Sequence, residues 1–495
     1  MGIVRKQSII SSLITYAGFV IGAINVLWLF PHFVGNSGLG LTRVLLDVSL
    51  FFSTACTLGS VPIAFKFFPF YQSYLPPEKN DLHLITFSLC FLGCLLFIII
   101  MPHLKPLIIR KFGEHSPLFV DYFDLIYPFT IIIAFFNLLE AYAWSLKKTV
   151  LSNAMKELVF RVLTSLFIIA FALKWISFSH FIHLYSYVYL LPVLILVMVL
   201  WSSGKIKLNF SISSVTRRLK GKIITFGSFI FLGSLLNIIS RTNDTIIIAS
   251  KAKGGLVDAA VFSIATYLIT IMEVPQRSLV SITTPFIAEA WHKRDVKKID
   301  EIYKKTALNL LIVGLAIFGL VLLNIDDAVK FLGPAYEPIK VIVLYMGIAK
   351  IIDLGTGMNS QILFLSKFWK IDFFTQILLV VVSIPLNYWL TSSYGVIGPA
   401  FGNLIALTTY NTVRFIFLWK FFKLQPFTVQ NLKAALLALA CFALVYLIPN
   451  TGHIYLNVFI RSAVFLLLYG FAILKLKASD DITGLVETAK AKFRW

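Results

Sequence analysis

The chain has 495 residues, of which 58% are hydrophobic and 14% charged, compared with about 45–50% and about 25% in soluble domains. Its mean hydropathy of +0.86 and its 46 phenylalanines exceed what one water-soluble core can bury, and they exclude a disordered, collagenous or coiled-coil chain. Most of the chain is therefore predicted to lie in lipid, where the net charge of +21 reports on topology rather than on nucleic-acid binding.

Mostly apolar stretches of about 20 residues recur along the whole chain, separated by short polar loops. Each is long enough to cross a bilayer as a helix, and the sequence contains fourteen of them. They cover residues 8–30, 41–65, 82–103, 121–145, 151–173, 181–201, 222–248, 257–287, 306–325, 338–365, 371–392, 395–419, 432–449 and 454–476. The predicted fold class is therefore all-α, a polytopic membrane protein with fourteen transmembrane helices.

The basic residues predict the orientation of these helices, because short cytoplasmic loops collect Lys and Arg. With an even number of helices both termini lie on the same side. A cytoplasmic N-terminus puts 29 Lys and Arg in the internal segments and 8 in the external loops. We therefore predict a multi-pass protein with both termini in the cytoplasm.

The second half of the chain repeats the layout of the first at an offset of about 216–221 residues. A glycine turn followed by a proline-bearing helix occurs at residues 38–69 and again at 254–285. Because each half has six helices, the halves share one orientation and form a paired bundle typical of transporters. The sequence thus predicts an N-lobe at 1–205 (helices 1–6), a C-lobe at 206–424 (helices 7–12), and two extra helices with a cytoplasmic tail at 425–495.

Three sequence motifs resemble those of a known superfamily. They are ISRTNDTIII at 239–248, FLGPAY at 331–336, and PLN at 385–387 followed by YGVIGPA at 394–400. In this order and on these helices, the chain resembles the polysaccharide-export flippases of the multidrug/oligosaccharidyl-lipid/polysaccharide (MOP) exporter superfamily, which also holds the lipid II flippases and the drug antiporters. Fourteen helices depart from the twelve of many polysaccharide members and agree with the lipid II branch.

The resemblance implies two six-helix lobes in a V that open alternately to each side. It implies transport of undecaprenyl-diphosphate-linked oligosaccharide to the outer leaflet of the cell inner membrane, for polysaccharide or lipopolysaccharide synthesis. It is also compatible with coupling of transport to H⁺ or Na⁺, and with polysaccharide polymerase machinery as a partner.

Charged residues inside membrane helices cost roughly 2.5–3.5 kcal/mol each at the bilayer centre, so each needs a partner or a function. Four opposite pairs stand at helical spacing. They are Arg43 with Asp47, Arg241 with Asp244, Glu273 with Arg277, and Lys350 with Asp353. Mutual neutralisation during membrane insertion explains such pairs as well as function does.

The charged residues fall into two groups according to their depth in the membrane, judged by their distance from the predicted helix ends. Four of them lie near predicted helix ends, from which they are expected to reach the membrane interface: Arg43, Glu140, Arg414 and Arg461. The deeper cations are predicted to bind the diphosphate, because Arg and Lys suit phosphate oxygens; they are Arg161, Arg241, Arg277 and Lys350. The deeper carboxylates are the expected sites of ion coupling: Asp244, Glu273 and Asp353.

A sugar chain needs neutral hydrogen-bonding groups, and the helices contain nine such amides: Asn25, Asn137, Asn237, Asn243, Asn359, Gln361, Asn387, Asn403 and Asn411. Contacts between helices explain most of them. Asn25, Asn243 and Asn359 are predicted to bind substrate.

Two other classes of function remain as alternatives. A lipid II flippase or a drug/cation antiporter would belong to the same superfamily, although helix 1 (residues 8–30) lacks the early carboxylate expected of an antiporter. A membrane-embedded glycan polymerase should carry a long catalytic loop, and no predicted external loop exceeds about 18 residues. We therefore expect no enzymatic activity, no catalytic residues, no cofactor, no metal site and no nucleic-acid partner.

Overall fold

A computed structural model of the chain describes residues 2–484 except 208, 477, 480 and 482, so most of the predicted cytoplasmic tail lies outside the described residues. Every regular element within this part of the chain is helical. The helices gather into two compact units, unit 1 (Met1–Ala260) and unit 2 (Val261–Trp495). The predicted boundaries of lobes and extra helices remain a prediction, because compactness does not report membrane topology.

Unit 1 is built around α2 and α6, which pack on each other and on the helices around them. Leu41, Val44 and Leu45 of α2 are fully buried, as is Phe129 of α6. The elements of this unit are α1 (Gly2–Ile24), η1 (Asn25–Val34), α2 (Gly35–Cys56), α3 (Ser60–Tyr74), η2 (Pro77–Lys79), α4 (Leu82–Phe112), α5 (Pro117–Asp121), η3 (Phe123–Leu125), α6 (Ile126–Ser145), α7 (Thr149–Asn153), η4 (Ala154–Val159), α8 (Phe160–Ala172), α9 (Phe178–Ser186), α10 (Leu190–Trp201) and α11 (Ser214–Lys251). Helix α12 (Leu256–Thr270) leads into unit 2.

Small residues let the helices of unit 1 approach closely, as expected in lipid, where packing rather than water exclusion joins helices. A Cβ on Gly40 of α2 would lie 1.8 Å from the carbonyl oxygen of Leu256. A Cβ on Gly93 of α4 would lie 1.9 Å from the carbonyl oxygen of Cys56. Any side chain at either glycine would push two backbones apart.

The start of α11 is fixed by a carboxylate. Asp81 accepts hydrogen bonds from the Ser213 N–H (2.9 Å) and from the Thr216 hydroxyl (2.7 Å), at the end of the helix where backbone N–H groups are unpaired. Nearby, the Lys207 ammonium lies 2.7 Å from Glu78, and this hydrogen bond lowers the pKa of the Glu78 carboxyl below its ordinary value. Lys207 and the start of α11 are thus held to the loop that precedes α4.

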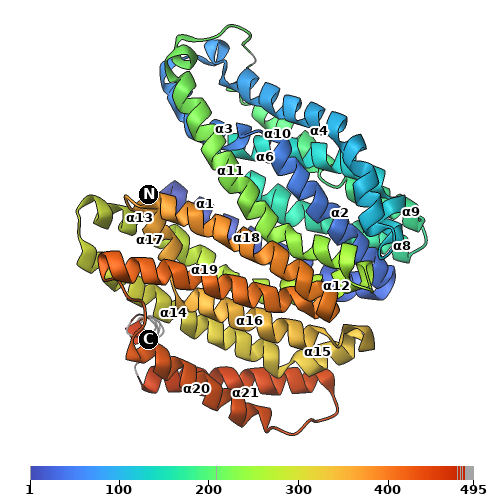
Figure 1. Cartoon of the computed structure of the whole chain (residues 1–495), viewed down its shortest axis with the longest axis vertical. Helices are drawn as coiled ribbons and strands as arrows, with labels where there is room; N and C mark the ends of the chain where they lie inside the picture. The colour runs from blue at the N-terminus through green and yellow to red at the C-terminus, as the bar shows by residue number, and fades with distance from the viewer. Residues whose placement is uncertain (1, 208, 477, 480, 482, 485–495) are drawn as a thin grey trace. The chain divides into compact units, whose positions relative to one another are not determined.

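Unit 2 is built around α14 and α19. Helix α14 packs on α13, α16, α20 and α21, while α19 packs on α16 and along the full length of α18 (Figure 1). The elements are α13 (Glu273–His292), α14 (Val296–Leu323), α15 (Ile325–Leu332), η5 (Pro334–Tyr336), α16 (Ile339–Gly355), α17 (Asn359–Leu365), α18 (Trp369–Tyr394), η6 (Gly395–Ile397), α19 (Gly398–Phe422), α20 (Val429–Tyr446) and α21 (Ile454–Lys475).

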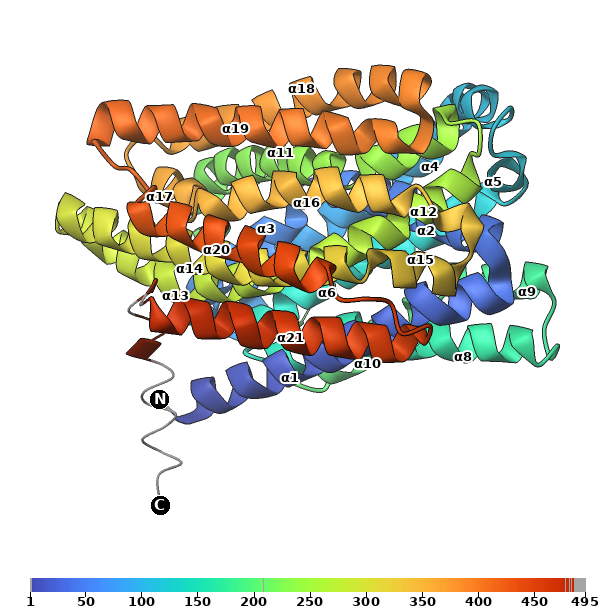
Figure 2. The ribbon, with the colours of Figure 1, turned by 90° about the horizontal axis from the view of Figure 1, so that it is seen from below.

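The two last helices form a hairpin on α14. Helices α20 and α21 run side by side (Figure 2), and their inner faces bury Cys441, Phe465 and Tyr469 against Ile312 of α14. They therefore belong to the packed body of unit 2, although they have no counterpart in the first half of the sequence.

The helices confirm a multi-pass membrane protein. Among the described residues, nine helices are long and apolar enough to cross a membrane, or up to eleven if each of two bent helix pairs is one span. Two of the nine, Leu13–Cys56 and Trp369–Phe422, each cover two of the predicted spans. The span predicted at 151–173 falls on α7, η4 and α8, where a π-helix interrupts the α-helix. The exact number of fourteen remains a prediction.

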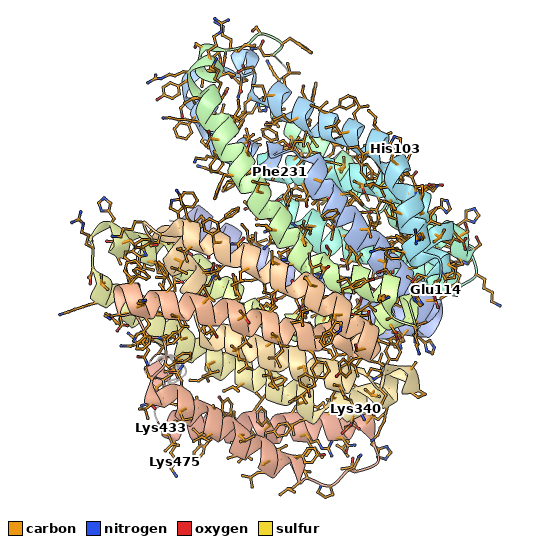
Figure 3. The ribbon with its side chains drawn as sticks, in the orientation of Figure 1. His103, Glu114, Phe231, Lys340, Lys433 and Lys475 are labelled. Carbon is orange, nitrogen blue, oxygen red and sulfur yellow. The ribbon has the colours of Figure 1, made fainter. Side chains whose placement is uncertain are left out.

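The ends of unit 2 differ in their basic residues. Lys433 near the start of α20 and Lys475 at the end of α21 lie at the same end of this unit, and Lys340 of α16 lies at the opposite end (Figure 3). Because consecutive long helices run antiparallel, the first end also carries the basic turn at 293–298. The two ends of unit 2 thus carry different basic residues, and which end is cytoplasmic stays a prediction.

Candidate functional site

Two helices of unit 2 are broken, and both breaks carry polar side chains. The pair Leu256–Thr270 and Glu273–Val280 is bent by 48°, and the pair Pro334–Gly355 and Asn359–Leu365 by 47°. The second break turns at Gly357, whose φ of +59° favours glycine and whose Cβ would lie only 2.9 Å from the backbone nitrogen of Ala307. Broken helices free backbone groups at membrane depth, where they are tolerated beside a cavity or within protein.

Three charges join the two breaks. The Lys350 ammonium donates to Asp353 on its own helix at 3.0 Å and lies 3.4 Å from Glu273 at the start of α13. Lys350 and Asp353 are mostly buried, with 13% and 18% of their side chains exposed, while 32% of Glu273 is exposed. Lys350 is thus held between two carboxylates on different helices.

The outermost member of this group is a guanidinium. Arg277 donates to Glu273 across one helical turn at 3.0 Å, and 56% of its side chain is exposed. Gln276, beside it in sequence, donates to Asp353 at 3.3 Å. The first turns of α13 therefore hold an exposed cation, paired with Glu273, and supply an amide to the carboxylate of Asp353 on α16.

At its buried end the group continues into neutral amides. Asn411 of α19 donates to Asp353 at 3.2 Å, and its carbonyl oxygen accepts from Thr356 (3.0 Å) and Asn359 (2.8 Å). Asn411 and Asn359 are almost fully buried. We call the whole set the helix-break network: Glu273, Gln276, Arg277, Lys350, Asp353, Thr356, Asn359 and Asn411.

The helix-break network has two cations and two carboxylates, so its formal charge is zero. Its side chains change from buried amides to a mostly exposed guanidinium, so the network offers one accessible cation backed by a second, buried one. A guanidinium with free N–H groups can bind phosphate oxygens in a forked geometry, and the lysine acts as a point charge behind it. Among the described residues no cluster of His, Cys, Asp or Glu has the geometry of a metal site.

A second ionic group in unit 2 corrects one prediction. Arg414 does not reach the interface: its side chain is 1% exposed, and it is ion-paired with Asp372 of α18, donates to Thr375 at 2.9 Å and lies over the ring of Tyr410. The prediction was wrong because it considered distance from the helix end and left out Asp372, whose carboxylate holds the guanidinium inside. Ser360 of α17 also donates to Asp372, at 3.0 Å.

Glu140 of unit 1 is likewise buried rather than interfacial, with 8% of the residue exposed. Lys156 of η4 lies 3.0 Å from it and supplies the neutralising charge. At the end of unit 2 that carries Lys340, Arg461 is 15% exposed and lies 3.6 Å from Asp327.

Asn25 and Arg161, two of the predicted substrate-binding residues, meet in unit 1. Asn25 of η1 donates to the carbonyl oxygen of Arg161 at 2.9 Å and accepts from Ser165 at 2.6 Å, as expected of an amide that joins two helices. The Arg161 guanidinium lies 3.0 Å from Glu157, and one of its nitrogens is buried with no hydrogen bond among the described residues.

The three predicted residues of α11 lie within about one helical turn and differ in exposure. Arg241 is exposed, Asp244 is buried, and the side-chain nitrogen of Asn243 is buried without a hydrogen bond to any described residue. One helix away, Arg43 lies 2.9 Å from Asp47 of α2, and Thr245 of α11 hydrogen-bonds to Asp47. The predicted pair at Arg43 is therefore formed, and it connects α2 to α11.

Of the ten predicted site residues, five lie in the helix-break network: Glu273, Arg277, Lys350, Asp353 and Asn359. The other five lie in unit 1: Asn25, Arg161, Arg241, Asn243 and Asp244. Gln276 and Thr356 were not predicted, because neutral polar residues are common in the helices, and Asn411 was not among the amides predicted to bind substrate. Glu157 was also missed, although its position four residues before Arg161 is the spacing of an ion pair.

No protein-family profile matches the sequence, and no curated protein matches it either. Solved structures do match its fold. The lipid II flippase MurJ in an inward closed conformation has 15% identity and a TM-score of 0.74, covering 94% of this chain and 98% of its own. A multidrug resistance MATE family transporter of the MOP superfamily, in an inward-facing conformation, has 16% identity and a TM-score of 0.62, covering 84% of this chain and 98% of its own.

A MATE structure in the straight conformation has 15% identity and a TM-score of 0.51, and it covers 85% of this chain and 95% of its own. These structures establish the fold. The chain is an all-helical, multi-pass membrane protein with the architecture of MOP-superfamily flippases and transporters.

Proposed function

We propose that this protein is a flippase that moves an undecaprenyl-diphosphate-linked oligosaccharide from the cytoplasmic to the outer leaflet by alternating access. The observation that carries the proposal is the helix-break network, in which an exposed arginine and a buried lysine stand at two broken helices of a flippase fold. We propose a transporter and not an enzyme.

In this proposal Arg277 makes the first contact with the diphosphate. Its exposed guanidinium now holds Glu273 through one hydrogen bond, and a diphosphate would offer stronger, forked acceptors. Glu273 released from Arg277 would still lie beside Lys350, whose charge neutralises it. The substrate thereby exchanges one ion pair for another, and Glu273 and Asp353 then share the single charge of Lys350.

The same exchange offers a route to ion coupling. When a diphosphate competes for Arg277 and Lys350, the carboxylates of Glu273 and Asp353 lose part of their neutralising charge. Uptake of H⁺ or Na⁺ by either carboxylate would restore the balance. We propose that loss of this ion after release returns the protein to its starting conformation.

A lipid-linked substrate is favoured over a drug by two observations. The match to the MurJ flippase extends over 94% of this chain, compared with 84% for the MATE transporter. The most exposed charge of the helix-break network is the guanidinium of Arg277, which suits a phosphate better than a cationic drug. The lipid-linked substrate could carry a polysaccharide repeat unit or be lipid II. The resemblance of the three sequence motifs favours the polysaccharide repeat unit.

We further propose that the end of unit 2 marked by Lys433 and Lys475 faces the cytoplasm, in the cell inner membrane, because basic residues concentrate at cytoplasmic ends. Both termini would then be cytoplasmic. Polysaccharide polymerase machinery would receive the substrate on the opposite side.

The test is a flipping assay with the full chain in proteoliposomes. A fluorescent undecaprenyl-diphosphate oligosaccharide is placed in one leaflet, and a membrane-impermeant quencher reports its arrival in the other. We expect the protein to accelerate transfer over protein-free vesicles, and Arg277→Gln to slow it about tenfold, the effect of losing one charged hydrogen bond. Lys433→Gln is the matched control, since this exposed cation lies outside the network. Transfer no faster than in protein-free vesicles would refute the proposal.

A further inference from the structure

A polar, open cavity of about 610 Å³ lies in unit 2, separate from the helix-break network. It is lined by α15, η5 and the start of α16 on one side and by the end of α20 and the first turns of α21 on the other, at the end of the unit that carries Lys340. Its polar lining includes Asp326, Lys330, Glu337, Asn450 and Arg461, together with the ring of Tyr446. A volume of this size lies within the range of roughly 300–1,000 Å³ that is usual for small-molecule sites.

The FLGPAY motif at 331–336 shapes one wall of this cavity. Gly333 ends α15 with a φ of +105°, a conformation that residues with a side chain rarely adopt, and Pro334 then starts η5. The turn brings Glu337 and Lys340 to the same cavity as Asp326 and Lys330. The FLGPAY motif, which contributes no residue to the helix-break network, therefore lines this cavity.

The charges of the cavity balance one another. Lys340 lies 2.7 Å from Asp326 and 2.8 Å from Glu337. Lys330 and Arg461 each lie 3.6 Å from Asp327, which is 1% exposed beneath them. Counting these six residues, three cations meet three carboxylates, so the cavity does not attract an anion through net charge.

Hydrogen-bonding capacity is nevertheless left over. Arg461 is 15% exposed and donates to the carbonyl oxygen of Ile448 at 3.3 Å, but its distance of 3.6 Å from Asp327 is too long for a hydrogen bond. Asp327 itself does not line the cavity, and its buried carboxylate neutralises Lys330 and Arg461. The acceptors that face the cavity are the exposed carboxylates of Asp326 and Glu337, beside the amide of Asn450. The cavity thus has donors and acceptors in one place and an aromatic ring, Tyr446, of which 62% is exposed.

We propose that this cavity binds a saccharide, the glycan of the substrate on its exit side. A sugar hydroxyl both donates and accepts, which suits a neutral mixture of carboxylates, an amide, lysines and an arginine better than a diphosphate does. The flat, exposed ring of Tyr446 suits the apolar face of a pyranose. The exit role depends on the proposed flippase function, whereas saccharide binding itself does not.

The proposal gives α20 and α21 a function, because Tyr446, Asn450 and Arg461 all come from this hairpin. The hairpin and the FLGPAY turn would together bind the sugar, at a place separate from the cations that bind the diphosphate. Selection for the glycan and for the phosphate would then reside in different parts of unit 2.

The test measures binding of soluble probes to the purified full chain in detergent by isothermal titration calorimetry. The probes are N,N′-diacetylchitobiose, maltose and inorganic pyrophosphate. We expect saturable binding of at least one disaccharide, weakened about tenfold by Tyr446→Ala and by Glu337→Gln. Tyr455→Ala is the control, because this tyrosine is on the same hairpin, is 79% exposed and does not line the cavity.

Glu337→Gln keeps the shape of a side chain that is 62% exposed, so its folding should match the wild type, as an unchanged melting temperature would verify. Binding of neither disaccharide, binding of pyrophosphate alone, or disaccharide binding that both variants leave unchanged would overturn the proposal. Disaccharide binding without flipping in proteoliposomes would refute the flippase function and leave the saccharide site standing. Flipping without disaccharide binding would refute the saccharide site and leave the flippase function standing.

Discussion

The ammonium of Lys350 lies 3.4 Å from the carboxylate of Glu273, and this one contact joins the two broken helices of unit 2. The residues are 77 positions apart in the sequence, and neither has the other as its helical neighbour. The pairs that the spacing does predict, Glu273 with Arg277 and Lys350 with Asp353, are both formed, and the cross-contact merges them into one network.

Removing Lys350 should therefore destabilise the protein by more than removing Arg277 does. Lys350→Gln leaves two carboxylates close together with one neutralising charge fewer, and we expect a loss of about 3 kcal/mol in the free energy of unfolding. Arg277→Gln, at an exposed side chain, should cost less than about 1 kcal/mol. Chemical unfolding in detergent measures both. The double variant Lys350→Gln/Asp353→Asn should recover part of the loss, and equal losses in the single and double variants would contradict the network.

Asn411 should be the amide on which the buried end of the network depends. Asn411→Leu leaves Thr356 and Asn359 without their shared acceptor, and we expect a loss of about 1–3 kcal/mol. Thr412→Leu, the next residue and exposed, is the control and should leave the unfolding curve unchanged. A similar loss in both variants would mean that leucine at this turn of α19, and not the missing amide, is responsible.

The buried pair of Arg414 and Asp372 should show strong coupling. Arg414→Met leaves a buried carboxylate uncompensated, and we expect a cost of about 3–5 kcal/mol. The double variant Arg414→Met/Asp372→Leu removes both charges and should be closer to the wild type than the single variant. The melting temperatures of the four proteins in this cycle measure the coupling, and additive effects would show that the two charges act independently.

Cysteine labelling should reveal the sidedness of unit 2. In intact cells, a membrane-impermeant maleimide should label Lys340→Cys but should label Lys433→Cys and Lys475→Cys only after the membrane is opened. The background should be low, because the four native cysteines are all buried. Labelling of Lys433→Cys in intact cells would reverse the proposed orientation.

Flipping should depend on the membrane potential. An inside-negative potential favours outward movement of an anion by about 2.3 kcal/mol per charge per 100 mV. A potassium diffusion potential imposed with valinomycin should therefore speed outward transfer of the diphosphate-linked probe and slow inward transfer. Equal rates with and without the potential would indicate that the substrate charge is compensated during the crossing, for instance by the coupled ion.

The sequence was sufficient for the class of fold, because hydropathy and loop charge report directly on lipid and water. It also identified five of the eight residues of the helix-break network, four of them because a charge in a membrane helix is conspicuous by itself. Gln276 and Thr356 were missed because neutral polar side chains are common in membrane helices, and only the bends that bring α13, α16, α17 and α19 together distinguish them. Arg414 was misjudged because its partner, Asp372, comes from another helix.

The helix breaks themselves were not predicted from the sequence. Pro275, which lacks a backbone donor, lies in the first turn of α13, just after the first break. The second break has no proline, and Gly357 is one of 27 glycines, so its position could be known only from the contact that its backbone makes with α14.

That contact has a mechanical consequence. At Gly357 one main chain touches another, with no side chain between them to deform or change rotamer. A shift of the middle of α14 would therefore be transmitted directly to the break between α16 and α17, and from there to the network residues one turn away on either side. Even one methyl group added at position 357 would meet the backbone of Ala307 and push α14 away from the break.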